Sequence, residues 1–379
     1  MLFRSVITYD KFLGLNNVDD PTRLKPGEML VASNVDIAGT LLSRRGREML
    51  KAGGAHSLHE SIFGLLAVVD NDLLLLDDDG TELRTVYETI GYTRVWFEDL
   101  PDGRVAFSNG LISGLATAAE TTAWGMPIPV DPGVGLAGDT PYMVTYVRSS
   151  DGRESGPTYG TMSIDPAQAI IGLPALAGHS INVYLAPYGE AMFLAGSTAT
   201  DTWTPTGDPL GPQFVGGVVE APPVGTVLEA WHGRILIADG TTLWATRPHQ
   251  PDLCDRSRDF VQFEHAITLL YGTGAGVFVG TEKALHFLAG GDISDLQFRT
   301  ATRGRVTKGS AVEIDTAYLP ADFRSGRGAL CIVGGVLTLL TGAGQAIALT
   351  AARYQRELAE VVATTRLRDG TLQYLASPV

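Results

Sequence analysis

The sequence predicts an all-β fold: a β-propeller with an inserted β-sandwich, preceded by an extended N-terminal arm. The 379 residues include 45 glycines and 20 prolines beside 45% hydrophobic residues, which is typical of many short strands joined by tight turns. A strand–turn–strand unit with Asp-Gly or Pro-Asp-Gly at its turn also recurs. Its spacing is about 30 to 45 residues once an insertion is removed, as expected of propeller blades.

Residues 1–50 predict an arm and a ring-closing strand. Turn signals at Asn16-Asn17, Asp20-Pro21 and Pro26-Gly27 punctuate a polar stretch. Such an arm can cross the propeller surface, and Asn34 to Ile37 can add a strand to the first sheet or to the last blade. Arg44-Arg45 suits an exposed or internally paired turn about as well as an ion pair between subunits. The candidate assembly contacts are Phe12, Leu15, Asn34, Arg44 and Arg45.

Residues 51–135 predict the first blades. Short apolar runs at Phe63 to Val69, Leu73 to Leu76 and Leu83 to Tyr87 are separated by Asp-Asn-Asp and Asp-Asp-Gly turns, which indicates a β-meander. The stretch "RVWFEDLPDGRVAFSNG" repeats this plan with Pro101-Asp102-Gly103 at its turn. We therefore expect one sheet after another here.

Residues 136–222 predict the inserted sandwich. Tyr142, Val144 and Tyr146 alternate with polar residues, and Pro/Gly-rich stretches mark both borders. The segment resembles a fibronectin type III-like module.

Residues 223–379 predict the remaining blades, with Asp239-Gly240 and Asp369-Gly370 at turns. Within them, "GQAIALTAARYQRELAEVV" places Leu349, Ala352 and Leu358 at roughly helical spacing. We expect a helix there, although the first half of the segment could also finish a strand.

Charge and cysteine content exclude several protein classes. A net charge of −14 argues against gripping the nucleic-acid backbone, which needs clustered Lys and Arg. Cys254 and Cys331 are too few for a disulfide framework and are expected to be free, buried thiols. The start of the chain lacks a long apolar signal region, and no apolar run approaches the roughly 18 residues of a spanning helix. We expect a soluble chain, assembled in the host cytoplasm, without membrane insertion.

No residue pattern in the sequence predicts catalysis, a cofactor or a metal. The glycines of "YGTGAGVFVG" precede a strand, whereas a dinucleotide loop precedes a helix, so they indicate a turn. The acids of "DNDLLLLDDDGTEL" break the order of a calcium loop and suit two hairpin turns. The histidines lack zinc-site spacing, and no G-x-S-x-G elbow occurs. We expect no enzyme activity, no cofactor and no metal.

The opening "FLGLNNVDDPTRLKPGE" followed by "SNVDIAGTLLSRRG" is similar to the N-terminal signature of tail nozzle, or tail tubular B-type, proteins of short-tailed bacteriophages. "VTYVRSSDGRESGP" resembles the opening of their inserted sandwich, and "GRILIADGTTLWATRP" resembles the return to the propeller. "GVFVGTEKALHFLAGGD" looks like a later blade of theirs. The chain is compact for this family.

The resemblance implies a structural virion protein: a homo-hexameric ring at the end of the tail tube that guides and gates genome ejection. Its implied partners are a tail adaptor or portal-proximal protein, tail fibre or tip proteins, and passing double-stranded DNA, which it does not bind specifically. An acidic conduit would repel DNA and reduce sticking, although an acidic chain is also simply more soluble. The candidate lumen or rim acids are Asp77, Asp78, Asp79, Asp99 and Asp102.

The alternative is a glycan-acting or glycan-binding β-propeller, because propellers often carry paired carboxylates around the central channel. The sequence lacks the repeated S-x-D-x-G-x-x-W turn of such enzymes.

Overall fold

The computed structural model describes residues 14–25, 28–31, 35–37, 41–43, 53–130, 140–162, 169–186, 189, 191–215, 219–319, 327–368 and 371–379. Within these ranges the chain is all-β apart from three single-turn 3₁₀ helices: η1 (Pro21–Arg23), η2 (Ile293–Asp295) and η3 (Thr316–Tyr318). No helix among them is long and apolar enough to cross a membrane.

Five four-stranded antiparallel sheets, here called blades I to V, follow one another as simple meanders. Their strands lie in chain order, so each turn joins hydrogen-bonded neighbours. Blade I contains β5 (Ala55–Ser61), β6 (Gly64–Val69), β7 (Asp72–Leu76) and β8 (Glu82–Tyr87); blade II contains β9 (Trp96–Asp99), β10 (Val105–Ser108), β11 (Ser113–Ala116) and β12 (Thr121–Ala123). Blade III contains β19 (Val227–Trp231), β20 (Arg234–Asp239), β21 (Thr242–Ala245) and β22 (Phe260–Gln262). Blade IV contains β23 (Ile267–Thr273), β24 (Gly276–Thr281), β25 (Ala284–Ala289) and β26 (Gln297–Arg303); blade V contains β27 (Val312–Ile314), β28 (Gly328–Val333), β29 (Val336–Thr341) and β30 (Ala346–Ala348).

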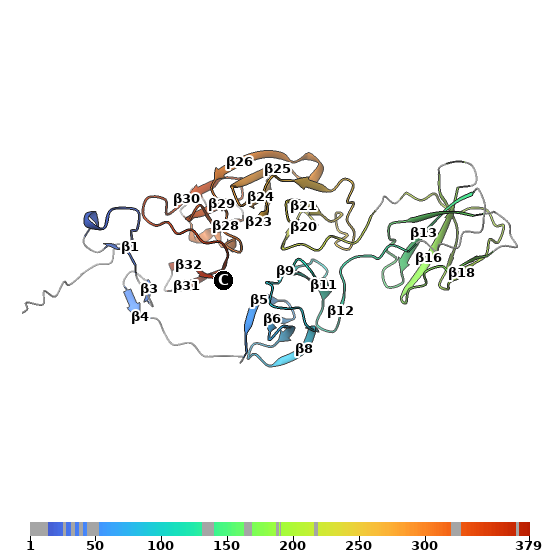
Figure 1. The fold of residues 1–379 in the computed structure, drawn as a ribbon, viewed down its shortest axis with the longest axis horizontal. Coiled ribbons are helices and arrows are strands. Elements are labelled where there is room, and N and C mark those ends of the chain that lie inside the picture. The colour runs from blue at the N-terminus through green and yellow to red at the C-terminus, as the bar shows by residue number, and fades with distance from the viewer. Residues whose placement is uncertain are drawn as a thin grey trace, which may run out of the picture.

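The first strand of each blade faces the common axis. β5 contacts β9, β9 contacts β19, β19 contacts β23, and β27 contacts β31 (Val361–Arg368). The sheets are arranged around this axis, with the inserted domain off to one side (Figure 1). This is the predicted β-propeller with an inserted sandwich and an N-terminal arm.

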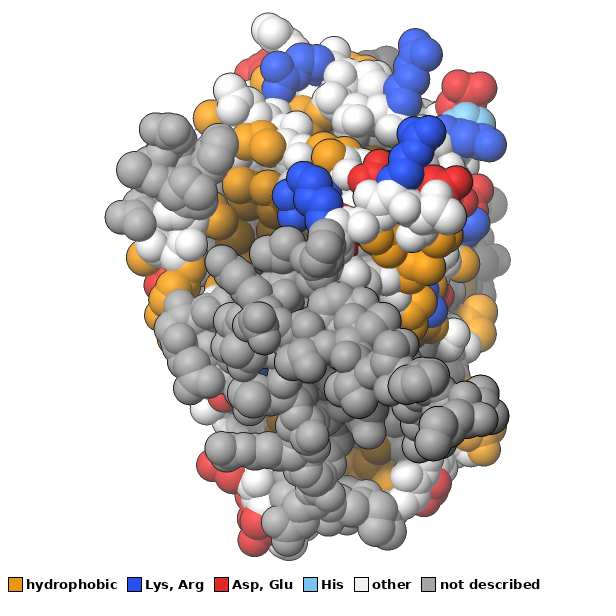
Figure 2. All heavy atoms as spheres, turned by 90° about the vertical axis from the view of Figure 1, so that its left-hand side faces the viewer, with side chains coloured by type: hydrophobic (Ala, Val, Ile, Leu, Met, Phe, Trp, Pro, Cys, Tyr) orange, Lys and Arg blue, Asp and Glu red, His pale blue; other side chains and the backbone are white. Residues whose placement is uncertain are grey.

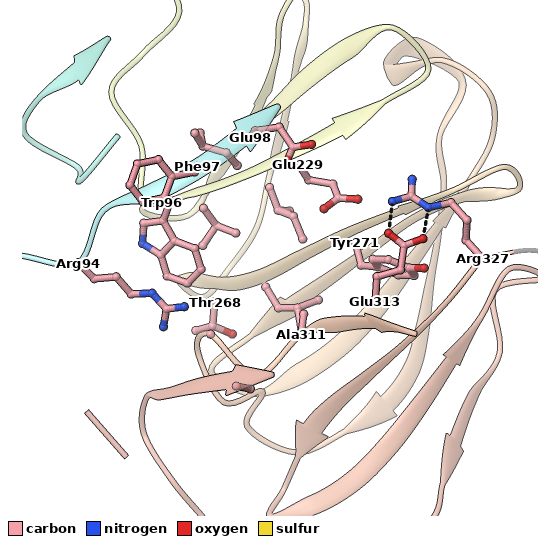
Figure 3. A pocket seen from close by; sticks show the side chains of 16 residues that line it. Arg94, Trp96, Phe97, Glu98, Glu229, Thr268, Tyr271, Ala311, Glu313 and Arg327 are labelled. Carbon is pink, nitrogen blue, oxygen red and sulfur yellow. Dashed lines mark hydrogen bonds and ion pairs between the residues drawn. The ribbon is translucent and has the colours of Figure 1, made fainter. Parts of the chain in front are cut away.

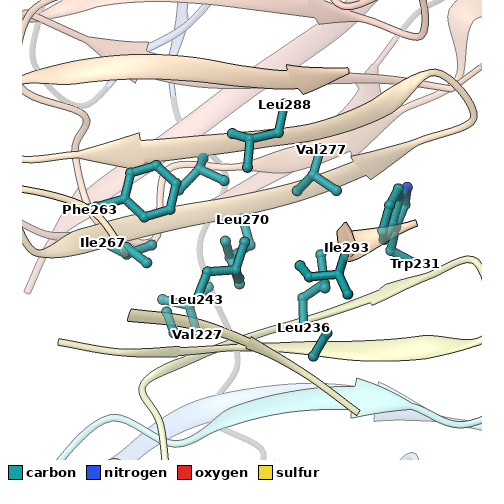
Figure 4. Packing of buried hydrophobic residues seen from close by; sticks show 13 residues of the cluster. Val227, Trp231, Leu236, Leu243, Phe263, Ile267, Leu270, Val277, Leu288 and Ile293 are labelled. Carbon is teal, nitrogen blue, oxygen red and sulfur yellow. The ribbon is translucent and has the colours of Figure 1, made fainter. Parts of the chain in front are cut away.

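Each pair of successive blades shares its own apolar cluster. Between blades III and IV, Leu236 and Leu243 meet Val277 and Leu288, with Trp231 at one end (Figure 4). Similar clusters join blades I and II, II and III, and IV and V. Burying one such leucine contributes about 1.5–3 kcal/mol. Because blades pack face to face, their first strands are left to line the axis.

Two hairpins lie outside the five blades. β31 and β32 (Thr371–Pro378) form one, and β3 (Val35–Ile37) and β4 (Leu41–Ser43) form the other. Leu372 and Tyr374 of β32 pack on the cluster of Leu330 and Leu339 in blade V, and the Tyr374 hydroxyl donates to the Ser310 carbonyl at 2.7 Å. The β31–β32 hairpin therefore sits where the next blade after blade V belongs.

The inserted domain has two layers. One is a four-stranded sheet in the order β14 (Thr158–Met162), β13 (Thr140–Arg148), β16 (His179–Leu185) and β17 (Phe193–Thr198); the other pairs β15 (Ile170–Ile171) with β18 (Thr202–Trp203). Ile170 and Trp203 share one buried cluster with Tyr142 and Val144, so the two layers enclose a core.

A buried carboxylate ties the sandwich to the propeller. Asp252 follows β21 and is fully buried. It pairs with Arg104 of blade II at 3.2 Å and with Arg148 of the sandwich at 3.1 Å, and it also contacts Arg153. Arg104 also pairs with Asp102 at 2.6 Å. The insertion is thus anchored by charge-assisted hydrogen bonds as well as by its two chain connections.

The arm reaches the far end of the chain. β1 (Gly14–Leu15) pairs in parallel with β2 (Glu28–Met29). The backbone N–H of Asn17 donates to the Arg353 carbonyl at 2.9 Å. The Asn17 side chain donates to the Gln355 carbonyl and accepts from the Gln355 backbone N–H. The arm is therefore held on the connection between blade V and β31.

The predicted turns of blade I are confirmed: Asp70 and Asn71 link β6 and β7 with positive φ of 49° and 82°, which Asp and Asn tolerate better than most residues. The free, buried state of Cys254 and Cys331 is confirmed as well. The predicted helix in residues 344–362 is wrong, and the alternative, that the first half of the segment finishes a strand, is confirmed. β30 pairs there with β29, and the Leu349 amide continues that pairing onto the Leu337 carbonyl. Sheet pairing outweighs helical spacing because intrinsic propensity is a weak preference.

Candidate functional site: the axial pocket

A polar pocket of about 230 Å³ lies on the axis, where the first strands of blades II to V and β31 meet. Strand alternation explains which side chains enter it. In β9, Trp96 and Glu98 are two residues apart and share a face, as Val227 and Glu229 do in β19. Figure 3 shows Glu98 and Glu229 on adjacent strands, extending toward the same space.

Glu98 and Glu229 hold the least solvated carboxyl groups of the pocket. The Gly272 amide donates to Glu229 at 2.8 Å, and the Ala230 amide donates to Glu98. Burial raises the pKa of Glu98 to about 7, with a smaller contribution from the charge of Asp99. Burial also raises the pKa of Glu229 well above its usual value, and the charge of Glu98 adds to this. Both side chains are half-buried and line the pocket.

The cations of the pocket already have partners. Arg327 makes two hydrogen bonds to Glu313, at 2.8 and 2.7 Å, and this pair raises the pKa of Arg327. Arg94 donates to the Val361 carbonyl at 2.6 Å and lies 4.0 Å from the centre of the Trp96 ring. No ion pair to Glu98 or Glu229 occurs within the described part of the chain.

Tyr271 adds an unused polar group. Its side chain is only 3% exposed and lines the pocket; its hydroxyl makes no hydrogen bond of normal geometry among the described residues, although the Arg327 guanidinium lies 5.6 Å from the centre of its ring. Burial raises its pKa, so the hydroxyl stays protonated at neutral pH. The arrangement can hold protons on the two carboxyls or accept hydrogen bonds from a bound group. The described residues contain no group of three or more His, Cys, Asp or Glu side chains placed to hold a metal ion.

Four of the five predicted acids lie on turns, Asp99 ends strand β9, and none of the five lines the axial pocket. Asp77 and Asp79 close their own turn by accepting from the Thr81 amide, at 2.8 and 2.9 Å; exposed Asp78 lies between them. Asp99 faces His59 at 3.2 Å in blade I, and Asp102 belongs to the arginine cluster around Asp252. The five acids therefore lie at three separate places.

Of the predicted assembly contacts, only Leu15 lies within the described residues, half-buried in β1. Phe12, Asn34, Arg44 and Arg45 lie outside them.

Sequence reasoning missed the glutamates of the axis. A usable signal exists: Glu98, Glu229 and Glu313 each fall in the first strand of a repeat unit, among residues that are otherwise mostly apolar or aromatic. Aligning the units by their turns would have placed the three carboxylates together on the inner strands. The Asp-Gly turns pointed instead to the acids at the hairpin tips as the candidate residues.

No known family model and no curated protein matches the chain. Solved structures that are similar to it include BBS1N, solved in complex with ARL6DN (10% identity, TM-score 0.33, covering 84% of this chain and 88% of that one). A streptogramin B lyase follows (9% identity, TM-score 0.32, covering 85% and 90%), as does Hsv2 of Kluyveromyces lactis (11% identity, TM-score 0.30, covering 89% and 88%). At these identities and scores the similarities say nothing about activity, and the fold assignment rests on the sheet topology described above.

Proposed function

We propose that the chain is a structural subunit of a bacteriophage tail nozzle, a homo-hexameric ring that guides and gates DNA ejection from the virion. The observation that carries the proposal is the order of parts along the chain. An arm with the nozzle-like signature precedes the blades, a sandwich interrupts them, and the arm is held on the chain's far end by Asn17.

The propeller axis is not the DNA path in this proposal. The axial pocket of about 230 Å³ is lined by side chains from several blades and is far too small for a duplex. DNA would pass through a lumen between subunits, toward which an acidic surface would limit sticking. The acids Asp77, Asp78, Asp79, Asp99 and Asp102 remain our candidates for that surface or its rim.

The side of the molecule that carries the arm offers a surface for self-association. Val31 is 75% exposed there, and Val18, Leu30 and Leu349 are also exposed. Hydrophobic side chains are visible on this side beside Lys, Arg, Asp and Glu (Figure 2). Exposed apolar groups rimmed by charges are typical of protein interfaces.

The arm also completes the propeller in this proposal. β31 and β32 supply the two inner strands of a sixth blade, and β3 and β4 supply its two outer strands. Connectivity favours this order, because the outermost strand of each blade leads into the innermost strand of the next, and β4 leads into β5. In the sequence, residues 44–54 connect β4 to β5. A connection this short favours a β3–β4 hairpin that belongs to the same chain as blade I.

The face of blade I that looks away from blade II is consistent with such a neighbour. Ala67, Val69, Leu74 and Leu76 form a buried apolar cluster whose members all come from β6 and β7. In the other blades of the ring, the equivalent face packs on the preceding blade. In this proposal, a sixth blade between blade V and blade I is the neighbour that buries this cluster and closes the ring.

Hydrogen exchange tests the ring closure. If β3 pairs with β32, the β32 amides that point away from β31 are protected in the full chain, and they become fast-exchanging when residues 1–43 are deleted. Amides of β24 in blade IV serve as the internal control and keep their protection. Equally fast exchange of those β32 amides in both proteins would refute the closure.

Native mass spectrometry of the full chain tests the ring assembly. The proposal expects a species of about six chains for the full-length protein. It expects fewer chains per particle when residues 1–43 are deleted. A stable monomer that binds or cleaves a glycan would instead support the second candidate.

That second candidate, a glycan-acting or glycan-binding propeller, is favoured by one observation: two carboxyls with raised pKa values, Glu98 and Glu229, face the axial pocket. A general acid and its partner carboxylate would be such a pair. Screening the full chain and its Glu229→Gln variant against an oligosaccharide panel tests it. Hydrolysis or binding that the variant loses would favour the glycan function over the nozzle.

A further inference from the structure

The axial pocket contains more hydrogen-bond acceptors than its own donors satisfy. Each of Glu98 and Glu229 receives one backbone amide, and neither contacts a cation among the described residues. The Tyr271 hydroxyl adds an oxygen without a partner in a side chain that is 3% exposed. A buried polar group without a hydrogen bond costs about 1–3 kcal/mol.

The pocket's two cations are already held by other partners, although Arg327 also lies beside Tyr271, 5.6 Å from the centre of its ring. Arg327 is held by Glu313 in a two-bond pair, and Arg94 is fixed between the Val361 carbonyl, Glu360 and the Trp96 ring. Glu98, Glu229 and Tyr271 come from three different blades, and of their polar atoms only the Tyr271 hydroxyl is buried without a hydrogen bond.

We propose that the axial pocket binds a small protonated amine, whose ammonium group donates hydrogen bonds to Glu98, Glu229 and the Tyr271 hydroxyl. A volume of about 230 Å³ has room for a small organic cation. Two carboxylates and a phenol oxygen match the three donors of an ammonium group. A divalent metal ion is the poorer occupant, because no metal-holding group of His, Cys, Asp or Glu side chains occurs among the described residues.

The pocket also predicts how binding depends on pH. Glu98, whose pKa is about 7, must lose its proton before its carboxylate can form an ion pair with the ammonium group. Glu229 must do so as well, and its pKa is also raised. The titratable and charged groups that face this pair are Asp99 on β9, Tyr271 on β23, Glu313 on β27, Arg327 before β28 and Arg94 before β9. Binding should weaken at least tenfold between pH 8 and pH 6, because protons compete for the same carboxylates.

The test is isothermal titration calorimetry of the full chain at pH 8 with n-butylammonium, with n-butanol as its neutral isostere. We expect the ammonium to bind at least ten times more tightly than the alcohol. Glu98→Gln and Glu229→Gln should each weaken binding at least tenfold, and Tyr271→Phe should weaken it a few-fold. Glu264→Gln, which changes an exposed carboxyl outside the pocket, should leave affinity within twofold.

Several results would overturn the amine site: equal binding of n-butanol, tighter binding of Mg²⁺ than of n-butylammonium, or ammonium binding that Glu98→Gln and Glu229→Gln leave unchanged. Because glutamine keeps the shape of glutamate and adds no charge, these variants are expected to fold. The inference rests on neither proposed function, since the pocket lies within one chain. If the protein is a monomer that binds the amine, only the nozzle proposal is refuted. If it forms the ring but does not bind the amine, only the amine site is refuted.

Discussion

Replacing Asp252 with Asn should destabilise the protein strongly, because it removes the one buried charge shared by three arginines. Asp252 is fully buried, while Arg104, Arg148 and Arg153 have side chains 20–23% exposed. Removing one partner of a buried pair usually costs about 3–5 kcal/mol. Since Arg104 keeps Asp102 and the other two arginines keep Asp151, the loss should be about 2–4 kcal/mol.

Urea unfolding followed by tryptophan fluorescence measures this loss. Glu282→Gln is the matched control, because Glu282 forms an exposed ion pair with Arg305 at 3.9 Å and should change the unfolding free energy by less than about 0.5 kcal/mol. If Asp252→Asn also changes it by less than about 1 kcal/mol, the arginine cluster does not anchor the sandwich as argued.

Three further predictions follow from burial. Cys254 and Cys331, whose pKa values burial raises to about 12, should react with a thiol reagent only after unfolding; rapid labelling of the native protein would contradict their burial. Because the folded pKa of Glu98 lies at about 7, above the ordinary 4.5, the folded state binds the extra proton. The unfolding free energy should therefore fall as pH rises from about 4.5 to about 7, and less so in Glu98→Gln, as urea titrations across this range would show. Gly276→Ala should lower the unfolding free energy measured in urea by about 2 kcal/mol or more, because the φ of Gly276 is +151° and an added Cβ would lie 2.1 Å from the Leu288 carbonyl oxygen. Gly274→Ala is the control, because an added Cβ there meets open space. Equal effects of the two substitutions would refute the steric argument.

The fold was largely predictable because its signals are local. Asp70-Asn71, Pro101-Asp102-Gly103 and Asp239-Gly240 mark turns by their own backbone preferences, and the strands between them are short and apolar. The helix expected around Leu349 failed because its residues complete a sheet whose other strand lies earlier in the chain. The partner strand β29 is only four residues upstream, so the hairpin is a local alternative that the sequence allowed for the first half of the segment, and helical spacing alone did not decide between the two.

The axial site was not predictable in the same way. Glu98, Glu229 and Tyr271 lie in three separate units and meet only because the blades are arranged around one axis. Their raised pKa values come from burial, which a sequence does not show directly. The arginine cluster around Asp252 was missed for the same reason, since Arg104 and Asp252 are 148 residues apart.

Cryo-electron microscopy of the assembled full-length protein tests the nozzle assignment most directly. The account predicts a six-fold ring of propellers around a lumen wide enough for a DNA duplex, with the arm side of each subunit at the contact between neighbours. Particles that remain single propellers at concentrations far above those in a cell, or rings whose only opening is the side-chain-filled propeller axis, would contradict it.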